Sequence, residues 1–313
     1  ADQPTFAEIE AAARAAGIVV AHQPIISGKV SEEDAATFGE LTDRLPKPIL
    51  AYCRTGTRSA TIWSLSEGAR GRPITDILAA TKMAGYDMSG VVRRIANGGK
   101  TPTDVADATH DVVIIGGGAA GIAVAASLKA RKRDLDIAII DPAEIHYYQP
   151  GWTMVGGGVF DPAVTARTMA SLIPAGVRWI KAAVAAFEPE KKAVILDGCR
   201  VVKYSKLIVA PGIKLDWSAI EGLVETLGRN GVTSNYRYDL APYTWELVQG
   251  LKKGRAVFTQ PPMPIKCAGA PQKALYLSSD HWLRSGALNN IDVDFFNAGP
   301  VLFGVKDYVP ALM

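Results

Sequence analysis

The feature that most constrains the fold is a glycine-rich hexapeptide, GGGAAG, at Gly116–Gly121. An apolar run that predicts a strand over Asp111–Ile115 precedes it, and a predicted helix over Ile122–Ala130 follows it. A second apolar run, Asp136–Ile140, then predicts a parallel strand, and Asp141 stands twenty residues after the last glycine. This order of strand, glycine turn, helix, strand and acidic residue predicts a βαβ unit that binds a dinucleotide.

Each glycine of this motif has a physical task. Gly116 permits a tight turn, Gly118 lets the backbone approach a pyrophosphate, and Gly121 lets the helix pack closely on the strand. The free N–H groups of the helix N-terminus face the phosphates, and the acidic side chain accepts hydrogen bonds from a ribose. The cofactor-binding residues predicted from this motif are Gly116, Gly118, Ala119, Ala120, Gly121 and Asp141.

A second motif indicates which dinucleotide is bound. The segment Lys206–Gly212, KLIVAPG, is an apolar run that ends in Pro211 and Gly212. It resembles the strand-and-glycine segment with which two-dinucleotide flavoproteins return to their FAD. Together the two motifs favour FAD as the cofactor, and Pro211 and Gly212 join the predicted cofactor-binding residues.

The residues after the glycine motifs disfavour two classes of flavoprotein. Residues 142–160 contain no cysteine, whereas disulfide reductases carry a redox cysteine pair there. NADH dehydrogenases carry a second glycine fingerprint, but Arg255–Gly269 has prolines where such a turn needs glycines. The segment Pro264–Lys273, PIKCAGAPQK, instead resembles the sulfide:quinone oxidoreductases, as do Tyr147–Trp152 and Phe303–Lys306.

This resemblance runs from about His110 to the end of the chain and implies a role for Cys267. The matching cysteine of the family relays sulfur between sulfide and FAD, and a quinone then takes the electrons. Lys266 and the start of a predicted helix stand beside Cys267 and favour a nucleophilic thiolate. The resemblance further implies that a second redox cysteine, a quinone pocket and membrane-docking helices lie beyond Met313. We therefore expect the chain to be incomplete at its C-terminal end.

A second reactive cysteine is predicted in the first third of the chain. A short buried strand is expected over Ile49–Tyr52, then a polar loop over Cys53–Ser59, then a helix over Ala60–Ala69. Backbone N–H groups in such a loop form an anion-binding nest, and Arg58 can clamp an oxyanion. The same positive field lowers the pKa of the Cys53 thiol. The remaining residues of the predicted anion-binding loop are Arg54, Thr55, Gly56, Thr57 and Ser59.

The segment from Gln3 to about Arg94 resembles the phosphatase-like domains of beta-lactamase-hydrolase-like proteins, which are related to dual-specificity phosphatases. The opening strands of such a domain are missing, which indicates truncation at this end too. Cys53 and Arg58 are separated by four residues rather than the five of tyrosine phosphatases, as in rhodaneses. The strand expected over Ile18–Ile26 also holds no aspartate to protonate a leaving group. Sulfur transfer is favoured; a phosphatase or a non-catalytic anion-binding module remains the alternative.

These patterns define an α/β chain with two parts. Residues 1–96 are expected to form a phosphatase-like or sulfurtransferase-like α/β domain, 97–108 a linker, and 109–313 an incomplete Rossmann-type FAD/NAD(P)-binding domain. Sulfide, a quinone and a small sulfur acceptor are the expected partners, with peripheral membrane contact of the whole protein. The net charge of +3 argues against nucleic acid, and three cysteines form no disulfide framework. We expect no metal site and a cytoplasmic location, with a position at the inner membrane as the alternative.

Overall fold

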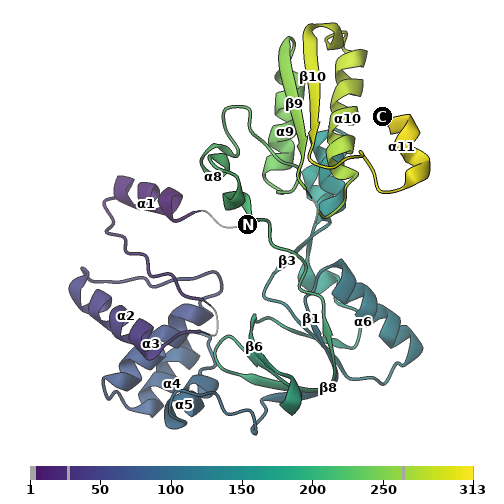
Figure 1. The fold of residues 1–313 in the computed structure, drawn as a ribbon. Helices are drawn as coiled ribbons and strands as arrows, with labels where there is room; N and C mark the ends of the chain where they lie inside the picture. Colours follow the sequence, from purple (N-terminus) through teal and green to yellow (C-terminus); the bar gives the residue numbers. More distant parts are fainter. Residues whose placement is uncertain (1–4, 27–28, 263–264, 313) are drawn as a thin grey trace. The chain divides into compact units, whose positions relative to one another are not determined.

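The computed structural model describes residues 5–26, 29–262 and 265–312 (Figure 1). The chain divides into two compact units. The first comprises residues 1–144 and 169–212, and the second comprises residues 145–168 and 213–313. The domain boundaries expected at 96 and 109 stay a prediction.

The described part of the first 96 residues is helical. Its five α-helices are α1 Phe6–Ala15, α2 Glu32–Arg44, α3 Thr57–Ala69, α4 Ile74–Met83 and α5 Ser89–Ala96. Helices α1 and α2 begin with the capping boxes of Thr5 with Glu8 and Ser31 with Asp34, in which side chain and backbone exchange hydrogen bonds. Ile62 and Leu65 of α3 and Val91 of α5 belong to a buried core to which α2 also contributes.

The two strands predicted for this region are wrong. Residues 18–26 and 49–53 are neither strands nor helices, and they pair with no strand in the described part of the chain. A strand requires a hydrogen-bonding neighbour, which an apolar run alone does not supply. Leu50 is 85% exposed, so the segment predicted as buried is also open to solvent. The predicted helix at Ala60 instead begins at Thr57.

The second half of the first unit is built on a six-stranded sheet. Its order is β5 (Val177–Ile180), β2 (Ile137–Ile140), β1 (Ala108–Ile115), β8 (Val201–Val209), β7 (Ala193–Leu196) and β6 (Val184–Glu188). Strands β5, β2, β1 and β8 run parallel, and β8, β7 and β6 form an antiparallel extension. The predicted βαβ unit is confirmed, and with it the α/β fold class.

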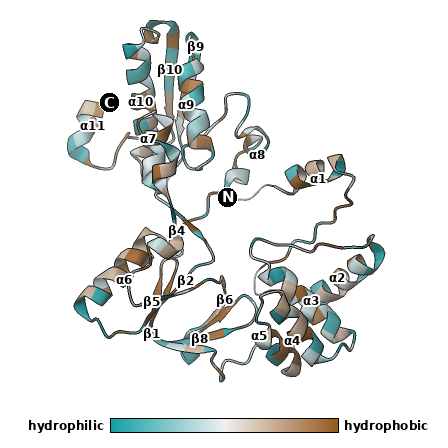
Figure 2. Cartoon of the chain, turned by 180° about the vertical axis from the view of Figure 1, so that it is seen from behind, coloured by the Kyte–Doolittle hydropathy of each residue, from teal (hydrophilic) through white to brown (hydrophobic). Residues whose placement is uncertain are grey.

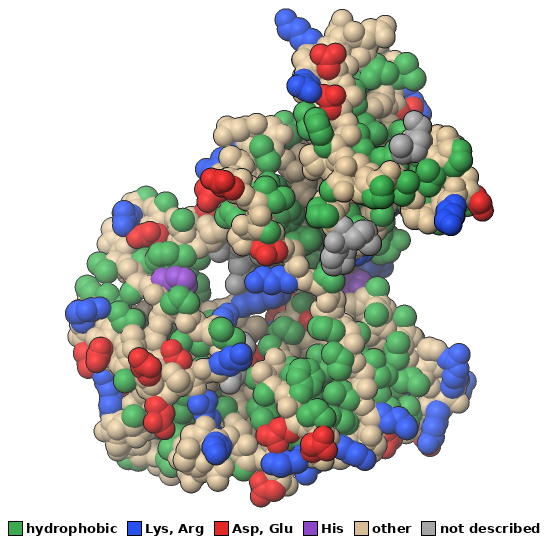
Figure 3. Space-filling view, viewed as in Figure 1, with side chains coloured by type: hydrophobic (Ala, Val, Ile, Leu, Met, Phe, Trp, Pro, Cys, Tyr) green, Lys and Arg blue, Asp and Glu red, His purple; other side chains and the backbone are tan. Residues whose placement is uncertain are grey.

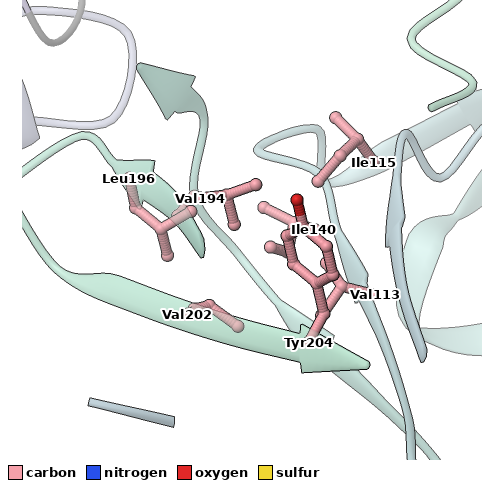
Figure 4. Close-up of a cluster of buried hydrophobic side chains, with 8 residues drawn as sticks. Val113, Ile115, Ile140, Val194, Leu196, Val202 and Tyr204 are labelled. Atoms are coloured by element: carbon pink, nitrogen blue, oxygen red, sulfur yellow. The ribbon is translucent and has the colours of Figure 1, made fainter. Parts of the chain in front are cut away.

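Alternating side chains of β1 serve two cores. Val112 and Ile114 pack with the strands β2 and β5 and with α6 (Ala119–Arg131) on one face. Val113 and Ile115 pack on the other face against the antiparallel strands, where Tyr204 closes the cluster (Figure 4). Side chains pack on both faces of the parallel strands, which explains the continuous apolar runs in the sequence. Figure 2 colours the same strands by hydropathy.

The turn between β7 and β8, Asp197–Arg200, is buried. A short polar turn usually lies at the surface, but Asp197 and Cys199 are only 6% and 5% exposed. The cysteine belongs to the helical core described above, and a Cβ atom on Gly90 of α5 would overlap its backbone. The helices of the first 96 residues therefore cover this turn, which no local sequence pattern could indicate.

The second unit holds two small sheets. Strands β3 (Ile145–Tyr147) and β4 (Ala166–Thr168) pair antiparallel, and β9 (Gly254–Gln260) and β10 (Ile291–Asn297) pair parallel. Its helices are α7 Trp152–Gly156, α8 Leu223–Thr226, α9 Leu240–Gly250, α10 Ala270–Arg284 and α11 Val309–Leu312. Trp282 and Val248 belong to the larger of the two hydrophobic cores among its described residues. No helix in the described ranges is both long and apolar enough to cross a membrane.

Candidate functional site

The glycine loop lies at the carboxyl end of β1, between two neighbouring strands. The N–H group of Gly116 donates to the Ile140 carbonyl at 2.9 Å, which ties the loop to β2. Gly116 has a φ of 102°, and a Cβ atom there would overlap the carbonyl oxygen of Ala210 after β8. Only glycine therefore allows the first glycine motif and the KLIVAPG segment to adjoin.

Gly121 is closely packed, whereas Gly118 has open space around it. A Cβ atom on Gly121 would overlap the carbonyl oxygen of Gly116, so the third glycine is required by close packing. A Cβ atom on Gly118 would meet nothing within 4 Å, and this residue is exposed with Ala119 and Ala120. Gly118 caps α6 without a side-chain hydrogen bond. Open space and free N–H groups at this helix N-terminus fit a pyrophosphate.

Asp141 supports the same loop. Its carboxylate accepts the N–H of Gly117 at 2.6 Å and the N–H of Ala143 at 2.7 Å. A carboxylate offers about four acceptor positions, so capacity for a ribose hydroxyl remains.

Gly212 follows β8 with a φ of 76° and is exposed beside Pro211. These residues fit FAD: the loop would hold its pyrophosphate and Asp141 a ribose.

The loop Cys53–Ser59 directs hydrogen-bond donors at the Cys53 sulfur, and its role in binding an anion stays a prediction. Burial raises the pKa of the Cys53 thiol. Hydrogen bonds from the backbone and side chain of Ser59, and from the backbone of Thr55 and Arg58, lower that pKa by more. The net effect favours the thiolate, as the sequence predicted. The donors lie in the first turn of α3 and directly before it, which accounts for the predicted spacing of cysteine, arginine and serine.

Gly56 fixes the shape of this loop. It has a φ of 80° and stands as the N-cap of α3. A Cβ atom there would overlap the hydroxyl of Tyr86, which therefore lies against the loop. Sequence reasoning missed Tyr86, because it stands in no motif and thirty-three residues after Cys53.

The guanidinium of Arg58 forms a hydrogen bond within the protein. Its Nη1 donates to the backbone carbonyl of Ile25 at 2.8 Å. The guanidinium thus ties α3 to the segment before α2, and its proposed role as an oxyanion clamp stays a prediction. The roles predicted for Arg54 and Thr57 also stay predictions. The hydroxyl of Thr55 donates to the hydroxyl of Thr57 at 3.2 Å.

Cys267 belongs to the second unit and is exposed, three residues before α10. Its φ of 64° is left-handed, a conformation that costs a residue with a side chain about 1–2 kcal/mol. Strained positions of this kind cluster at functional sites. Pro264, the first residue of the segment PIKCAGAPQK, lies outside the described residues.

Tyr236 holds the backbone of this segment. Its hydroxyl donates to the carbonyl of Lys266 and approaches the carbonyl of Cys267 at 3.4 Å. Burial, and secondly the charge of Cys267, raise the pKa of Tyr236 to about 12, so the hydroxyl stays a donor. The Lys266 ammonium donates to the side chain of Gln149 from the segment Tyr147–Trp152. Two of the segments that carried the family resemblance therefore meet, whereas Tyr236 was missed because it lies outside both.

Comparison with known proteins finds different relatives for the first and the later part of the chain. Residues 1–70 match the family model "Beta-lactamase hydrolase-like protein, phosphatase-like domain", and residues 110–243 match "Pyridine nucleotide-disulphide oxidoreductase". The mitochondrial sulfide:quinone oxidoreductase of Dictyostelium discoideum is 43% identical over 203 residues, covering 64% of this chain and 45% of that protein. A beta-lactamase hydrolase-like protein of Xylella fastidiosa is 32% identical over 92 residues, covering 29% of this chain and 21% of that protein.

A solved structure supports the fold. The sulfide:quinone oxidoreductase of Aquifex aeolicus superposes with a TM-score of 0.56 at 24% identity, over 65% of this chain and 48% of that chain. This chain spans about half the length of the oxidoreductases it matches. It therefore joins a region similar to the phosphatase-like domain to a region similar to the sulfide:quinone oxidoreductases. The latter region is similar to FAD-dependent oxidoreductases, as the sequence predicted.

Proposed function

We propose that the protein oxidises sulfide to sulfane sulfur with FAD and passes the electrons to a quinone. The observation on which the proposal rests is Cys267, an exposed thiol in a left-handed conformation within the segment PIKCAGAPQK. Similarity to the Dictyostelium enzyme over 203 residues supports the same activity. The glycine loop at Gly116–Gly121 gives the same protein a fitting cradle for FAD.

In this proposal Cys267 is the residue that receives sulfur. Hydrosulfide attacks the Cys267 sulfur of a disulfide that Cys267 shares with the second redox cysteine implied by the family resemblance. The S–S bond breaks, and the sulfur of that second cysteine leaves as a thiolate. A persulfide remains on Cys267, and its sulfane sulfur is oxidised by two electrons relative to sulfide. Bound FAD supplies the acceptor for that electron pair. Because quinones are apolar and reside in lipid, the proposal includes peripheral contact with a membrane.

The role of Cys267 is tested with a matched pair of variants in the FAD-loaded protein. Cys267→Ser should retain FAD and lose reduction of the flavin by sulfide by about a hundredfold or more, since a hydroxyl cannot carry the sulfur. Cys199→Ser, which alters a buried thiol away from the proposed chemistry, should leave that reaction unchanged. Equal flavin reduction in parent and Cys267→Ser protein would reduce Cys267 to a structural residue.

For the first region we propose sulfur transfer by Cys53. Its thiolate is favoured by the four hydrogen bonds of the nest, and no acid for a phosphoester leaving group stands in residues 18–26. The thiolate attacks the outer sulfur of a donor, the donor's S–X bond breaks, and Cys53 becomes a persulfide. A small thiolate acceptor then removes that sulfur and restores Cys53. Fusion to a source of sulfane sulfur raises the local concentration of donor.

This proposal is tested by exposing the chain to thiosulfate and analysing its cysteine peptides by mass spectrometry. The Cys53 peptide should gain the mass of one sulfur atom, and cyanide should remove it as thiocyanate. Cys53→Ser should lose this cyanide-dependent turnover. An unmodified Cys53 together with rapid phosphate release from an aryl phosphate would favour the phosphatase alternative. Binding of anions without either reaction would favour the non-catalytic module.

A further inference from the structure

A pocket of about 280 Å³ lies beside the Cys53 loop, in the first unit. Nine residues line it, contributed by the segment before Cys53, by α3 and α4, and by the turn after α4. Those that matter for its chemistry are Ala51, Ser59, Trp63, Ala80, Ala84 and Tyr86. The proposed sulfur transfer does not by itself require such a pocket, because thiosulfate is small and carries no organic group.

The lining is apolar and uncharged. Two aromatic rings and four alanines dominate it, and none of the nine residues is acidic or basic. One of its hydroxyls, that of Thr81, already donates to the carbonyl of Ile77 at 2.9 Å. A pocket of this composition favours an apolar or aromatic group and gives no partner to the charged groups of a peptide.

Both aromatic walls are held in place. The guanidinium of Arg72 lies 5.3 Å from the centre of the Trp63 ring, and Glu67 fixes that guanidinium at 2.9 Å. The hydroxyl of Tyr86 abuts Gly56, where no Cβ atom would fit. The rings therefore need little ordering when a flat group enters between the helices, which favours binding.

The pocket is joined to the sulfur chemistry through shared residues. Ser59 lines the pocket and also donates, from its backbone and its side chain, to the Cys53 thiolate. Gly56 lines it as well and forms the turn between Cys53 and α3. A donor whose outer sulfur meets Cys53 therefore has its organic substituent close to the mouth of this pocket.

We propose that the Cys53 site takes sulfur from small donors that carry an uncharged apolar substituent, aromatic rings above all, and that this pocket holds the substituent. The inference rests on the proposed sulfur transfer and names its substrate class: aryl persulfides and aryl thiosulfonates. With an aryl thiosulfonate, the Cys53 thiolate attacks the terminal sulfur, the S–S bond breaks, and an arylsulfinate leaves with the bonding electron pair. A persulfide forms on Cys53, so sulfur, charge and electrons balance without a further oxidant.

The test uses the whole chain and two donors that differ only in the substituent, benzenethiosulfonate and methanethiosulfonate. Transfer of sulfur to cyanide is measured as kcat/KM for each donor, and the turnover of Cys53→Ser is subtracted. The parent should prefer the phenyl donor by about tenfold, as expected when one face of a ring packs against an apolar pocket. Peptide mass spectrometry confirms that the persulfide resides on Cys53.

Variants of the pocket then test whether it causes the preference for the phenyl donor. Ala80→Leu and Ala84→Leu fill the pocket from α4 and its C-cap, and each should reduce the preference to about twofold or less with the methyl donor unaffected. Ala79→Leu is the matched control, because Ala79 is exposed on the same helix and does not line the pocket. It should keep the preference of the parent. Thermal melts of all three exclude misfolding as the cause.

The outcomes separate this inference from the proposed function. If both donors modify Cys53 at equal rates, or if the pocket variants retain the preference, sulfur transfer stands and the substrate class is wrong. If neither donor forms a persulfide on Cys53, sulfur transfer itself fails and the inference fails with it. Loss of the phenyl preference in Ala80→Leu and Ala84→Leu, but not in Ala79→Leu, supports both.

Discussion

The glycine loop at Gly116–Gly121 and the cysteine loop at Cys53–Ser59 present backbone N–H groups at the start of a helix, but they are supported differently. The glycine loop follows a strand that is paired on both sides, and two of its glycines are fixed by close contacts with the neighbouring backbone. The cysteine loop follows a segment with no strand partner in the described part of the chain, and Leu50 within that segment is 85% exposed.

This difference shows which contacts determine the shape of each loop. The sheet imposes the geometry of the glycine loop, so local residues need only avoid steric overlap. The cysteine loop obtains its shape from side chains and from one helix: Gly56 against Tyr86, Ser59 toward Cys53, and Arg58 toward Ile25. Substitutions should therefore have all-or-none effects in the first loop and graded effects in the second. Acidic and basic side chains lie intermixed on the face of the molecule in Figure 3.

The largest expected effect is that of Gly121→Val. The new side chain would overlap the carbonyl of Gly116, and the free energy of unfolding should fall by about 3 kcal/mol or more, measured by urea denaturation. Gly118→Val is the control in the same loop, because its Cβ meets nothing within 4 Å and its φ of −73° suits any residue. It should change stability by less than about 1 kcal/mol. Equal losses in both variants would contradict the roles assigned to the two glycines.

The next effect concerns Gly56→Ala in the cysteine loop. Its left-handed φ and the Tyr86 hydroxyl both oppose a side chain, and stability should fall by about 2–3 kcal/mol. Gly71→Ala isolates the first cause: its φ is 82°, but a Cβ atom there meets nothing within 4 Å. That control should lose only about 1 kcal/mol. If the two variants melt alike, Tyr86 does not buttress the loop.

A smaller effect is expected from Ser59→Ala. Loss of the side-chain hydrogen bond should raise the pKa of Cys53, while the backbone donors still oppose the effect of burial. The rate of alkylation of Cys53, followed by peptide mass spectrometry across pH, should reach its midpoint at a higher pH than in the parent. Ser64→Ala is the control, because the Ser64 hydroxyl donates to the carbonyl of Ala60. This variant should have the same midpoint as the parent. If alkylation of Cys53 in the parent reached its midpoint at the ordinary pKa of a thiol, the hydrogen bonds would not lower the pKa of Cys53.

The contrast between the loops also explains what the sequence could predict. Apolar runs and glycines were sufficient to predict β1, α6, β2 and the glycine loop, because these features act over neighbouring residues. The individual FAD-binding residues stay a prediction. The strands expected at 18–26 and 49–52 failed because strand formation depends on partners far along the chain. The burial of Cys199, the contact of Tyr236 with Lys266, and the pocket beside Cys53 arise from tertiary packing, and no local pattern encodes them.

The smallest effect concerns Asp197, which the helices bury beside the cysteine loop. Burial raises the pKa of Asp197, although the N–H of Ala183 and the charges of Arg200 and Arg58 oppose the shift. Because the folded-state pKa lies above the unfolded one, the protonated form is the one that folding favours. The free energy of unfolding should therefore fall as pH rises from the ordinary aspartate range through the raised value. Asp197→Asn cannot titrate and should lack that fall in urea titrations. An identical pH dependence in both proteins would show that Asp197 does not contribute.

The most direct test of the account is a titration of the chain with FAD and, separately, with NAD, followed by flavin absorbance and by calorimetry. The cradle formed by the glycine loop and the segment after β8 predicts one FAD bound per chain and no comparable binding of NAD. Gly118→Val should remain folded and lose FAD, because its side chain would occupy the open space assigned to the pyrophosphate. A folded parent chain that binds NAD but not FAD, or a Gly118→Val variant that binds FAD as tightly as the parent, would contradict the account.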